Sequence, residues 1–321
     1  GGVSHDFGNL TVLGAAQAYL ANGPFDNAQN YGRYNGFLKF TLLPSTTSKL
    51  QLSLSMYQGD WDGSGQIPSR EVSAGHLDRF GSIDPREGGR TDREDANLHY
   101  TFKPHPEDEF GLQLYGSRYK LALWSDFTFF KDTGLRFIQN PNGSVTDTRD
   151  SGPQPGANYV PGDGIEQNDK RWIYGARAHY ARFWSIFGRP VASKIGVETR
   201  NDDINVSLHR QVERHRFFTV NQLTVSERSV GSFSSNEFFL TDWARLEVGL
   251  RGDVFFFEGR NRLPRQAPDP NFRAVRIAGS TSASVISPKG NLGLTPGENT
   301  DGYRNFGEGF HSNDARNALL G

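Results

Sequence analysis

The chain has 321 residues, of which 35% are hydrophobic and 12% aromatic, and its 37 glycines favour β-structure with many turns. The absence of cysteine excludes disulfide scaffolds, thiol catalysis and cysteine-based metal sites, and a net charge of −1 gives no reason to expect a nucleic-acid partner. No window approaches about 18 uncharged apolar residues, so the sequence has no transmembrane helix, although a membrane-spanning barrel would not show one.

About eleven segments alternate apolar with polar residues, and this period of two is typical of β-strands with one apolar and one polar face. In chain order they are 8–20, 33–43, 49–58, 96–102, 110–124, 172–183, 193–208, 230–240, 244–257, 284–294 and 301–310. A change of phase near Ser117 predicts a β-bulge. The pattern predicts an all-β chain.

The alternation is longest in residues 244–257. One parity is apolar and the other is charged, so the second face requires water or a charged filling. The two sets are Leu246, Val248, Leu250, Val254 and Phe256, against Arg245, Glu247, Arg251 and Asp253. About 14 residues at roughly 3.3 Å each cross a hydrocarbon layer about 30 Å thick when tilted by about 45°. For this segment alone, a long strand of a soluble sandwich is an equal alternative.

The connections between these segments alternate between short and long. Short turns fall near residues 44, 105, 188, 242 and 298, and long polar stretches include 59–94 and 126–170. Outer-membrane barrels have short periplasmic turns and long extracellular loops, whereas a soluble sandwich has no reason to sort its loops in this way. Aromatic residues also recur near the segment ends, as in membrane-interface girdles. The sequence therefore predicts an antiparallel transmembrane β-barrel.

Five stretches resemble the barrel of TonB-dependent outer-membrane receptors: GDWDGSGQIPSR (59–70), RFGSIDPREGG (79–89), LTDWARLEVGLRGD (240–253), SPKGNLGLTP (287–296) and GEGFHSNDAR (307–316). The resemblance implies a barrel of about 22 strands around an N-terminal plug. It also implies uptake of a scarce ligand, such as a ferric siderophore or cobalamin, with energy from the TonB complex. The chain lacks a plug, a TonB box and a closing aromatic strand, so residues 1–321 are expected to be an internal part of such a barrel.

The charged parity of the strands is expected to face the lumen. The lumen-facing residues predicted in this way are Arg177, His179, Arg245, Glu247, Arg251 and Asp253, together with Glu198 and Arg200. Such charges need water or a polar plug beside them.

The long loops are the predicted ligand-binding elements, because the short turns on the other side cannot build a pocket. They combine aromatic and cationic side chains: Trp61, Arg70, Arg79, Phe80, Arg86, Arg90, Phe130, Arg136 and Tyr159. Aromatic faces with guanidinium groups suit a planar anionic ligand such as a ferric siderophore. The alternative is that each arginine pairs with a loop acid, among them Asp60, Asp78, Asp84 and Glu87, and only orders the loops.

Other site chemistry is sparse. Residues 60–65 imitate the start of a calcium loop but lack its later ligands. A cationic cluster of His209, Arg210, Arg214, His215 and Arg216 is predicted in an outer loop, where it could meet an anionic ligand or lipopolysaccharide or simply be solvated. No catalytic or nucleotide-binding motif occurs, so the chain is expected to be no enzyme and to hold no metal or cofactor.

Three functional classes remain open at this point. The first is a bacterial outer-membrane receptor, with membrane lipid, lipopolysaccharide, the TonB complex and a ferric siderophore as partners. The second is a passive outer-membrane pore or a barrel enzyme. The third is a soluble β-rich binding module.

Overall fold

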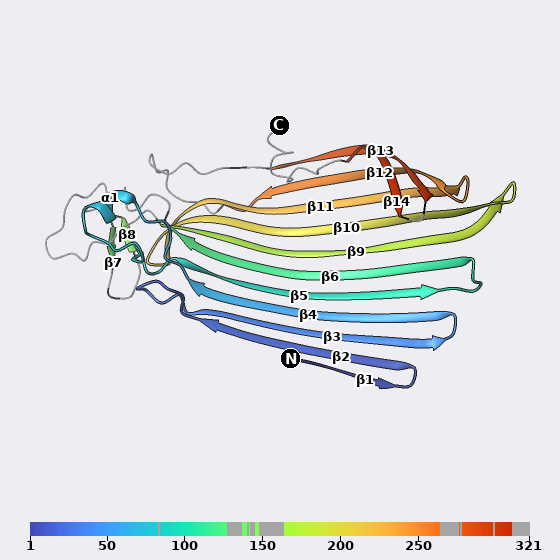
Figure 1. Cartoon of the computed structure of the whole chain (residues 1–321). Helices are drawn as coiled ribbons and strands as arrows, with labels where there is room; N and C mark the ends of the chain where they lie inside the picture. Colours follow the sequence, from blue (N-terminus) through green and yellow to red (C-terminus); the bar gives the residue numbers. More distant parts are fainter. Residues whose placement is uncertain are drawn as a thin grey trace.

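The computed structural model describes residues 1–82, 84–126, 137–139, 141, 145–147, 164–263, 276, 278–297 and 299–309. Within these ranges the chain forms one twelve-stranded sheet, in which neighbouring strands follow one another along the chain and every pair is antiparallel (Figure 1). A short helix, α1 (Ser69–Ser73), lies in the loop between β4 and β5. None of the described helices is long and apolar enough to cross a membrane.

The sheet contains β1 (Gly2–Phe7), β2 (Leu10–Ala21), β3 (Tyr31–Ser45), β4 (Ser48–Asp62), β5 (Gly88–Phe102), β6 (Asp108–Ser125), β9 (Gly164–Ile186), β10 (Arg189–Val212), β11 (His215–Phe239), β12 (Ala244–Asn261), β13 (Gly279–Gly297) and β14 (Thr300–Gly307). A separate hairpin pairs β7 (Phe137–Gln139) with β8 (Val145–Asp147). All eleven predicted strands are present. The sheet has one further strand, β1, which the sequence analysis did not predict.

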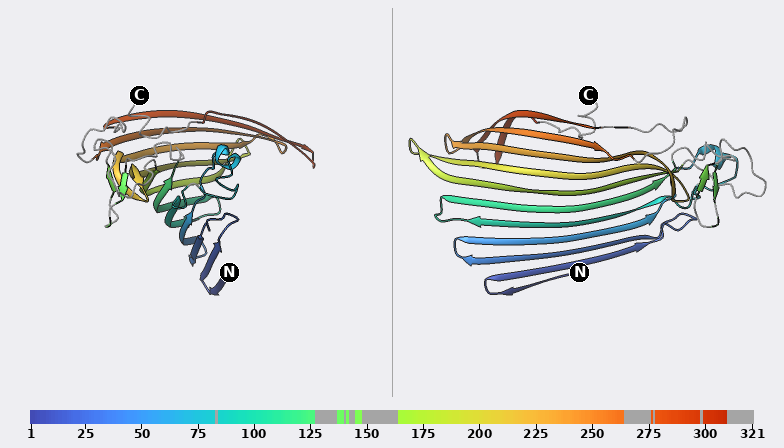
Figure 2. Two further views of the ribbon diagram at one scale, coloured as in Figure 1. Left: turned by 90° about the vertical axis from the view of Figure 1, so that its left-hand side faces the viewer. Right: turned by 180° about the vertical axis from the view of Figure 1, so that it is seen from behind.

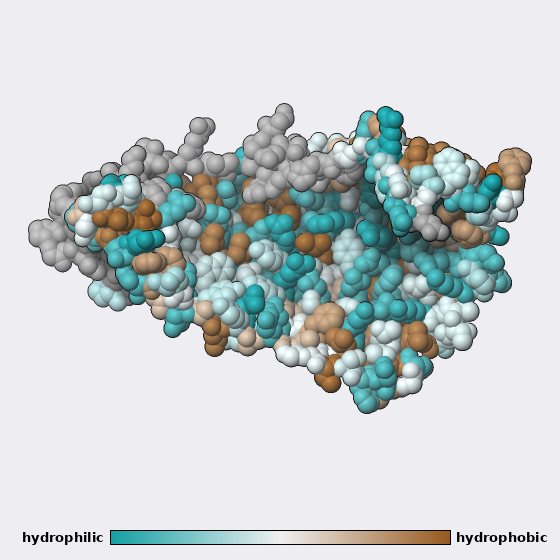
Figure 3. Space-filling view, in the orientation of Figure 1, coloured by the Kyte–Doolittle hydropathy of each residue, from teal (hydrophilic) through white to brown (hydrophobic). Residues whose placement is uncertain are grey.

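The two faces of the sheet differ in chemistry. On β12, Val248, Leu250 and Phe256 are 41%, 57% and 51% exposed on the face called here the outer face. The opposite, inner face carries Glu247 and Arg251, which form ion pairs with inner-face partners. The sheet is strongly curved (Figure 2). The inner face lines the concave side, where side chains two strands apart meet, as Arg251 of β12 and Glu198 of β10 do. Figure 3 looks into this side, where hydrophilic side chains cover much of the strands around a hollow.

The predicted bulge at Ser117 is wrong. The register of β6 with both β5 and β9 runs through this residue without a shift. The apolar residues change parity for another reason: on the outer face, Phe110, Leu112 and Leu114 are followed by Arg118. The change of phase therefore marks the height at which the outer face turns from apolar to polar.

The predicted outer loop after residue 208 is also wrong. β10 and β11 continue through this region and are joined by a two-residue turn at Glu213 and Arg214, whose φ angles are 51° and 66°. These positive angles are the geometry of a tight hairpin turn. The cationic cluster of residues 209–216 thus lies on strand ends and this turn. Register shifts at Leu208/His209 and Arg210/Gln211 obscure the alternation there.

The β10–β11 turn also breaks the predicted alternation of short and long connections, because it is short and lies at the loop-bearing end of the sheet. The long connection after β4 is shorter than predicted. It covers residues 63–87, because β4 continues to Asp62 and β5 begins at Gly88. The short turns near 44, 105, 188, 242 and 298 all lie at the opposite end of the sheet (Figure 1).

Candidate functional site

The loop of residues 63–87 lies at the loop-bearing end of the sheet and is held on one side by the β2–β3 connection. The backbone N–H of Asp26 donates to the carbonyl oxygen of Phe80 at 3.1 Å, and Asn27 Nδ2 donates to the carbonyl oxygen of Pro85 at 3.2 Å. The rings of Phe25 and Phe80 meet edge to face with centroids 6.4 Å apart. The loop therefore has a defined position although its sequence is polar.

The turn between β10 and β11 also holds this loop. Arg214 Nε donates to the carbonyl oxygen of Arg86 at 2.8 Å, and its Nη2 donates to Asp62 Oδ1 at 3.1 Å. The guanidinium lies 4.5 Å from the centre of the Trp124 ring. Glu213 forms an ion pair with the side chain of Arg86. We call these contacts of Glu213 and Arg214 the latch.

Three carboxylates are buried beneath the latch: Asp84, Glu87 and Asp126 are 5%, 9% and 2% exposed. Burial above all, and then the charges of Asp126 and Asp84, raise the pKa of Glu87 to about 7, although a backbone hydrogen bond from Asp126 acts in the opposite direction. The Glu87 carbonyl oxygen accepts from the backbone N–H of Gly63 at 2.7 Å. In the part of the chain that the structure describes, no group of three or more side chains is arranged to hold a metal ion.

Two of the predicted ligand-binding residues remain available in this loop. The guanidinium of Arg79 lies 5.2 Å from the centre of the Phe80 ring, and Phe80 is 40% exposed. Arg79 forms no ion pair with any described residue. An exposed aromatic ring beside an unpaired guanidinium is suited to a planar anion.

The other predicted loop residues are engaged or lie outside the described part. Arg70 bonds Glu71 at 3.1 Å, Arg86 bonds Asp84 at 2.9 Å, and Arg90 lies 3.7 Å from Asp92. Arg70 and Arg86 fit the alternative in which loop cations pair with acids, whereas the predicted loop position of Arg90 is wrong, because it lies on β5. The Trp61 ring packs against Gly89, where an added Cβ would lie 2.4 Å from the indole. Phe130, Arg136 and Tyr159 fall outside the described residues.

The inner face carries an apolar cluster at the loop-bearing end of β10, β11 and β12, which the sequence analysis missed. Ile204, Leu223, Val225 and Phe257 are buried, with Val206 and Phe255 packed against them. The rings of Phe255 and Phe257 are stacked, with centroids 6.2 Å apart and an angle of 7° between the ring planes. A signal was present in the sequence, because Phe255 and Phe257 occupy the parity of Arg251 and Asp253. The prediction of a charged inner face did not allow for this exchange.

Below this cluster is a cavity of about 180 Å³ lined by Arg200, Asp202, Glu227, Arg228, Ser229, Phe255 and Phe257. Arg200 donates to both oxygens of Asp202 at 2.9 Å. The cavity joins two aromatic faces to a fixed guanidinium on the concave side. Its lining combines these rings with two acids, Asp202 and Glu227, as well as two arginines, so it does not select for an anion.

Nearer the middle of the strands, ion pairs cross the inner face. Arg177 bonds Glu198 at 3.0 Å, and Glu198 in turn pairs with Arg251, which also bonds Asp253 at 2.6 Å. Arg251 reaches Glu198 across β11 at Gly231, where an added Cβ would lie 2.8 Å from the guanidinium. A side chain at this position would obstruct the connection.

The remaining predicted lumen-facing residues lie on the same face. His179 meets Glu109 at 3.2 Å, Glu247 meets Lys289 at 2.7 Å, and Arg245 lies 3.7 Å from Glu237. Most of the inner-face charges therefore have a counter-charge within the sheet.

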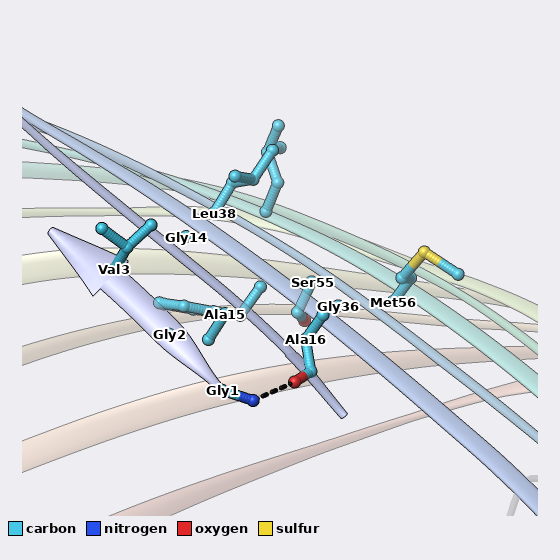
Figure 4. A pocket seen from close by; sticks show the side chains of 12 residues that line it. Gly1, Gly2, Val3, Gly14, Ala15, Ala16, Gly36, Leu38, Ser55 and Met56 are labelled. Atoms are coloured by element: carbon cyan, nitrogen blue, oxygen red, sulfur yellow. Dashed lines mark hydrogen bonds between the residues drawn. The ribbon is translucent and has the colours of Figure 1, made fainter. Parts of the chain in front are cut away.

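A larger groove, of about 720 Å³, lies on the opposite side of the molecule. Figure 4 shows Leu38 and Met56 projecting beside Gly14 and Gly36. The amino terminus of Gly1 donates a hydrogen bond to the carbonyl oxygen of Ala16 at 2.8 Å nearby. Its walls are mostly apolar and offer little hydrogen bonding. We therefore place the candidate ligand site on the loop and inner-face residues instead.

Comparison with known proteins identifies structures with the same fold. No family model and no curated protein matches the chain. Among solved structures, the unliganded ferric citrate transporter FecA superposes with a TM-score of 0.72 at 12% identity, covering 95% of this chain and 40% of FecA. The open form of the ferric-catecholate import receptor Fiu of E. coli K12 superposes with a TM-score of 0.68 at 11% identity, covering 95% of this chain and 51% of Fiu. The siderophore receptor PiuA of Acinetobacter baumannii superposes with a TM-score of 0.67 at 12% identity, covering 94% of this chain and 46% of PiuA.

These similarities show that the chain has the fold of a TonB-dependent receptor barrel. The chain spans between 40% and 51% of the length of the three proteins. The likeness therefore concerns part of their barrels, and what the whole proteins transport is a separate question.

Proposed function

We propose that the chain forms part of an outer-membrane receptor that takes up a ferric siderophore with energy from an inner-membrane TonB complex. The observation that carries the proposal is the shared fold over about 95% of the chain with a ferric citrate transporter and a ferric-catecholate import receptor. The partners are then the outer membrane, the TonB complex acting through a plug, and the iron-loaded ligand.

The outer face supports a location in the membrane. Apolar side chains such as Leu112, Ile195 and Leu250 are exposed on it, at 40%, 55% and 57%. Exposed apolar surface on most strands of a curved sheet is costly in water and favourable in a bilayer. The inner face, with its ion pairs, suits the hydrated or plugged interior of a large barrel.

The loop residues support an anionic, aromatic-compatible ligand. Arg79 and Phe80 offer a first contact at the loop-bearing end. Phe255, Phe257 and Arg200 repeat the same combination deeper on the concave side. A ferric siderophore with negative charge and planar groups matches the first of these places, while the deeper one supplies aromatic surface beside an arginine that is already paired with Asp202.

The test is energy-dependent uptake by the full-length receptor in Gram-negative cells, measured separately with radiolabelled iron as ferric citrate and as a ferric tris-catecholate. The double variant Arg79→Ala, Phe80→Ala should bind the transported complex about tenfold more weakly at equal surface expression. Arg70→Ala is the matched control, since its guanidinium is already bonded to Glu71 in the same loop. Iron entry that is unchanged when the proton gradient is collapsed would instead identify a passive pore.

A further inference from the structure

The outer face of β6 and β9 changes character at one height. On β6 the outward apolar residues Phe110, Leu112 and Leu114 give way to Arg118 and Lys120 on the same parity. On β9, Trp172 and Tyr174 are 56% and 44% exposed at this border. If the proposed membrane location holds, these aromatic rings mark an interface between hydrocarbon and headgroups.

The acids on this part of the outer face are already engaged. Glu94 bonds Arg118 at 3.3 Å, and the Arg118 guanidinium lies 5.6 Å from the Trp172 ring centre. Asp203 accepts hydrogen bonds from the hydroxyl groups of Tyr174 and Ser226, each at 3.3 Å. One row further along, Asp92 lies 3.7 Å from Arg90.

Two lysines in the same cross-strand row as Asp92 have no ion-pair or hydrogen-bond partner among the described residues. Lys120 on β6 is paired directly with Lys170 on β9, so both point to the outer face, with Asp92 and Asn205 as their other neighbours in the row. Neither lysine forms an ion pair or a hydrogen bond with any residue in the described ranges. Like charges placed directly opposite each other on a sheet are destabilising unless an anion lies between them.

We propose that Lys120 and Lys170 bind the phosphate of a phosphorylated outer-leaflet lipid, with Trp172 below them at the level where its acyl chains begin. Ammonium groups bind phosphate as point charges and need no fixed geometry. Their height, one row beyond the exposed Trp172, is that of a lipid headgroup rather than of the hydrocarbon. The inference rests on the proposed membrane location, and it assigns a lipid site that is separate from the uptake path on the inner face.

The experiment uses the purified full-length receptor in detergent, with diphosphorylated lipid A as the probe and native mass spectrometry to count bound lipid. The variant Lys120→Gln, Lys170→Gln should bind lipid A about 30-fold more weakly, given about 1 kcal/mol for each lysine near an anionic surface. The control Lys39→Gln, Lys194→Gln removes the same charge from the inner face and should bind lipid A as the unmodified receptor does. Dephosphorylated lipid A should show no difference between the variants.

Equal binding of lipid A by the two double variants would overturn the lysine site. Displacement of lipid A by inorganic phosphate at similar concentration would also overturn it, because the pair would then recognise free phosphate rather than a lipid. Failure of the proposed function is distinguishable, since a receptor that partitions into the aqueous phase without detergent contradicts the membrane location before any lipid is added.

Discussion

Glu87 lies at the centre of the contacts that position the loop of residues 63–87. Its carbonyl oxygen accepts from Gly63, and an added Cβ on Gly65, which has a φ of 63°, would lie 2.5 Å from its carboxylate. Asp84 and Asp126 lie beside it, and the next loop residue, Arg86, is held by Glu213 and Arg214 of the latch. The charge state of one buried carboxyl group therefore bears directly on how firmly the loop is held.

The position of this loop should depend on pH through Glu87. Because burial and the neighbouring acids raise its pKa to about 7 from 4.5, the closed loop binds the proton more tightly than an open loop does. The closed arrangement is then most stable at low pH, weakens as the pH rises from about 4.5 to about 7, and changes no further above that. Over this pH range we expect the closed loop to lose stability on the order of 2 kcal/mol relative to the open loop.

Hydrogen exchange of residues 63–87 in the full-length receptor, corrected for the intrinsic rate at each pH, measures this effect. Protection of the loop should fall between about pH 5 and pH 7, whereas Glu87→Gln should keep it constant. Protection that is independent of pH in the unmodified protein, or equally dependent in the variant, would show that Glu87 does not control the loop.

The hairpin of β10 and β11 is the element that closes one side of the candidate site. Its tip connects to Asp62 at the end of β4 and to Arg86 in the loop, and the contact between Arg214 and Asp62 joins residues 152 positions apart. Sequence patterns could not predict this contact, because it depends on how β5, β6 and β9, the three intervening strands, bring the two ends together. The hairpin tip itself also escaped prediction, since Glu213 and Arg214 adopt positive φ angles without glycine or asparagine.

Arg214→Ala should release the loop of residues 63–87. The substitution removes two hydrogen bonds and the contact with Trp124, which together stabilise the closed loop by about 2 to 3 kcal/mol. Hydrogen exchange in residues 63–87 should then be faster by about 30-fold or more, with the strands unchanged. Arg214→Lys should recover little, because an ammonium group cannot stack on the indole as a planar guanidinium does.

His215→Ala is the control for this change, because His215 is the exposed neighbour of Arg214 at the start of β11. Its exchange profile should match that of the unmodified receptor. If Arg214→Ala and His215→Ala exchange at the same rate in this loop, the latch has no role in holding it.

At the scale of the whole molecule, the fold was accessible from the sequence because its physical cause is a period of two. Alternation between apolar residues and charges, as in Leu250 and Arg251, specifies both the strands and their faces. The location of the short turns followed from the same pattern. The loop contacts and the apolar inner cluster around Phe257 were not accessible, because they depend on which distant strands the curvature brings together. The ligand-binding roles of the loop residues remain predictions.

The central claim is that the outer face contacts lipid while the inner face does not. Single cysteines can test it, because residues 1–321 contain none and any cysteine elsewhere in the full-length receptor can be replaced by serine. Single substitutions Val248→Cys, Leu250→Cys and Val254→Cys on one face, and Glu247→Cys and Asp253→Cys on the other, can each carry a fluorophore in the full-length receptor reconstituted into vesicles. A lipid-soluble quencher should reduce the emission of the first three labels and spare the last two. Quenching that does not alternate along β12, or that is absent at all five positions, would contradict the membrane-spanning barrel and the uptake function built on it.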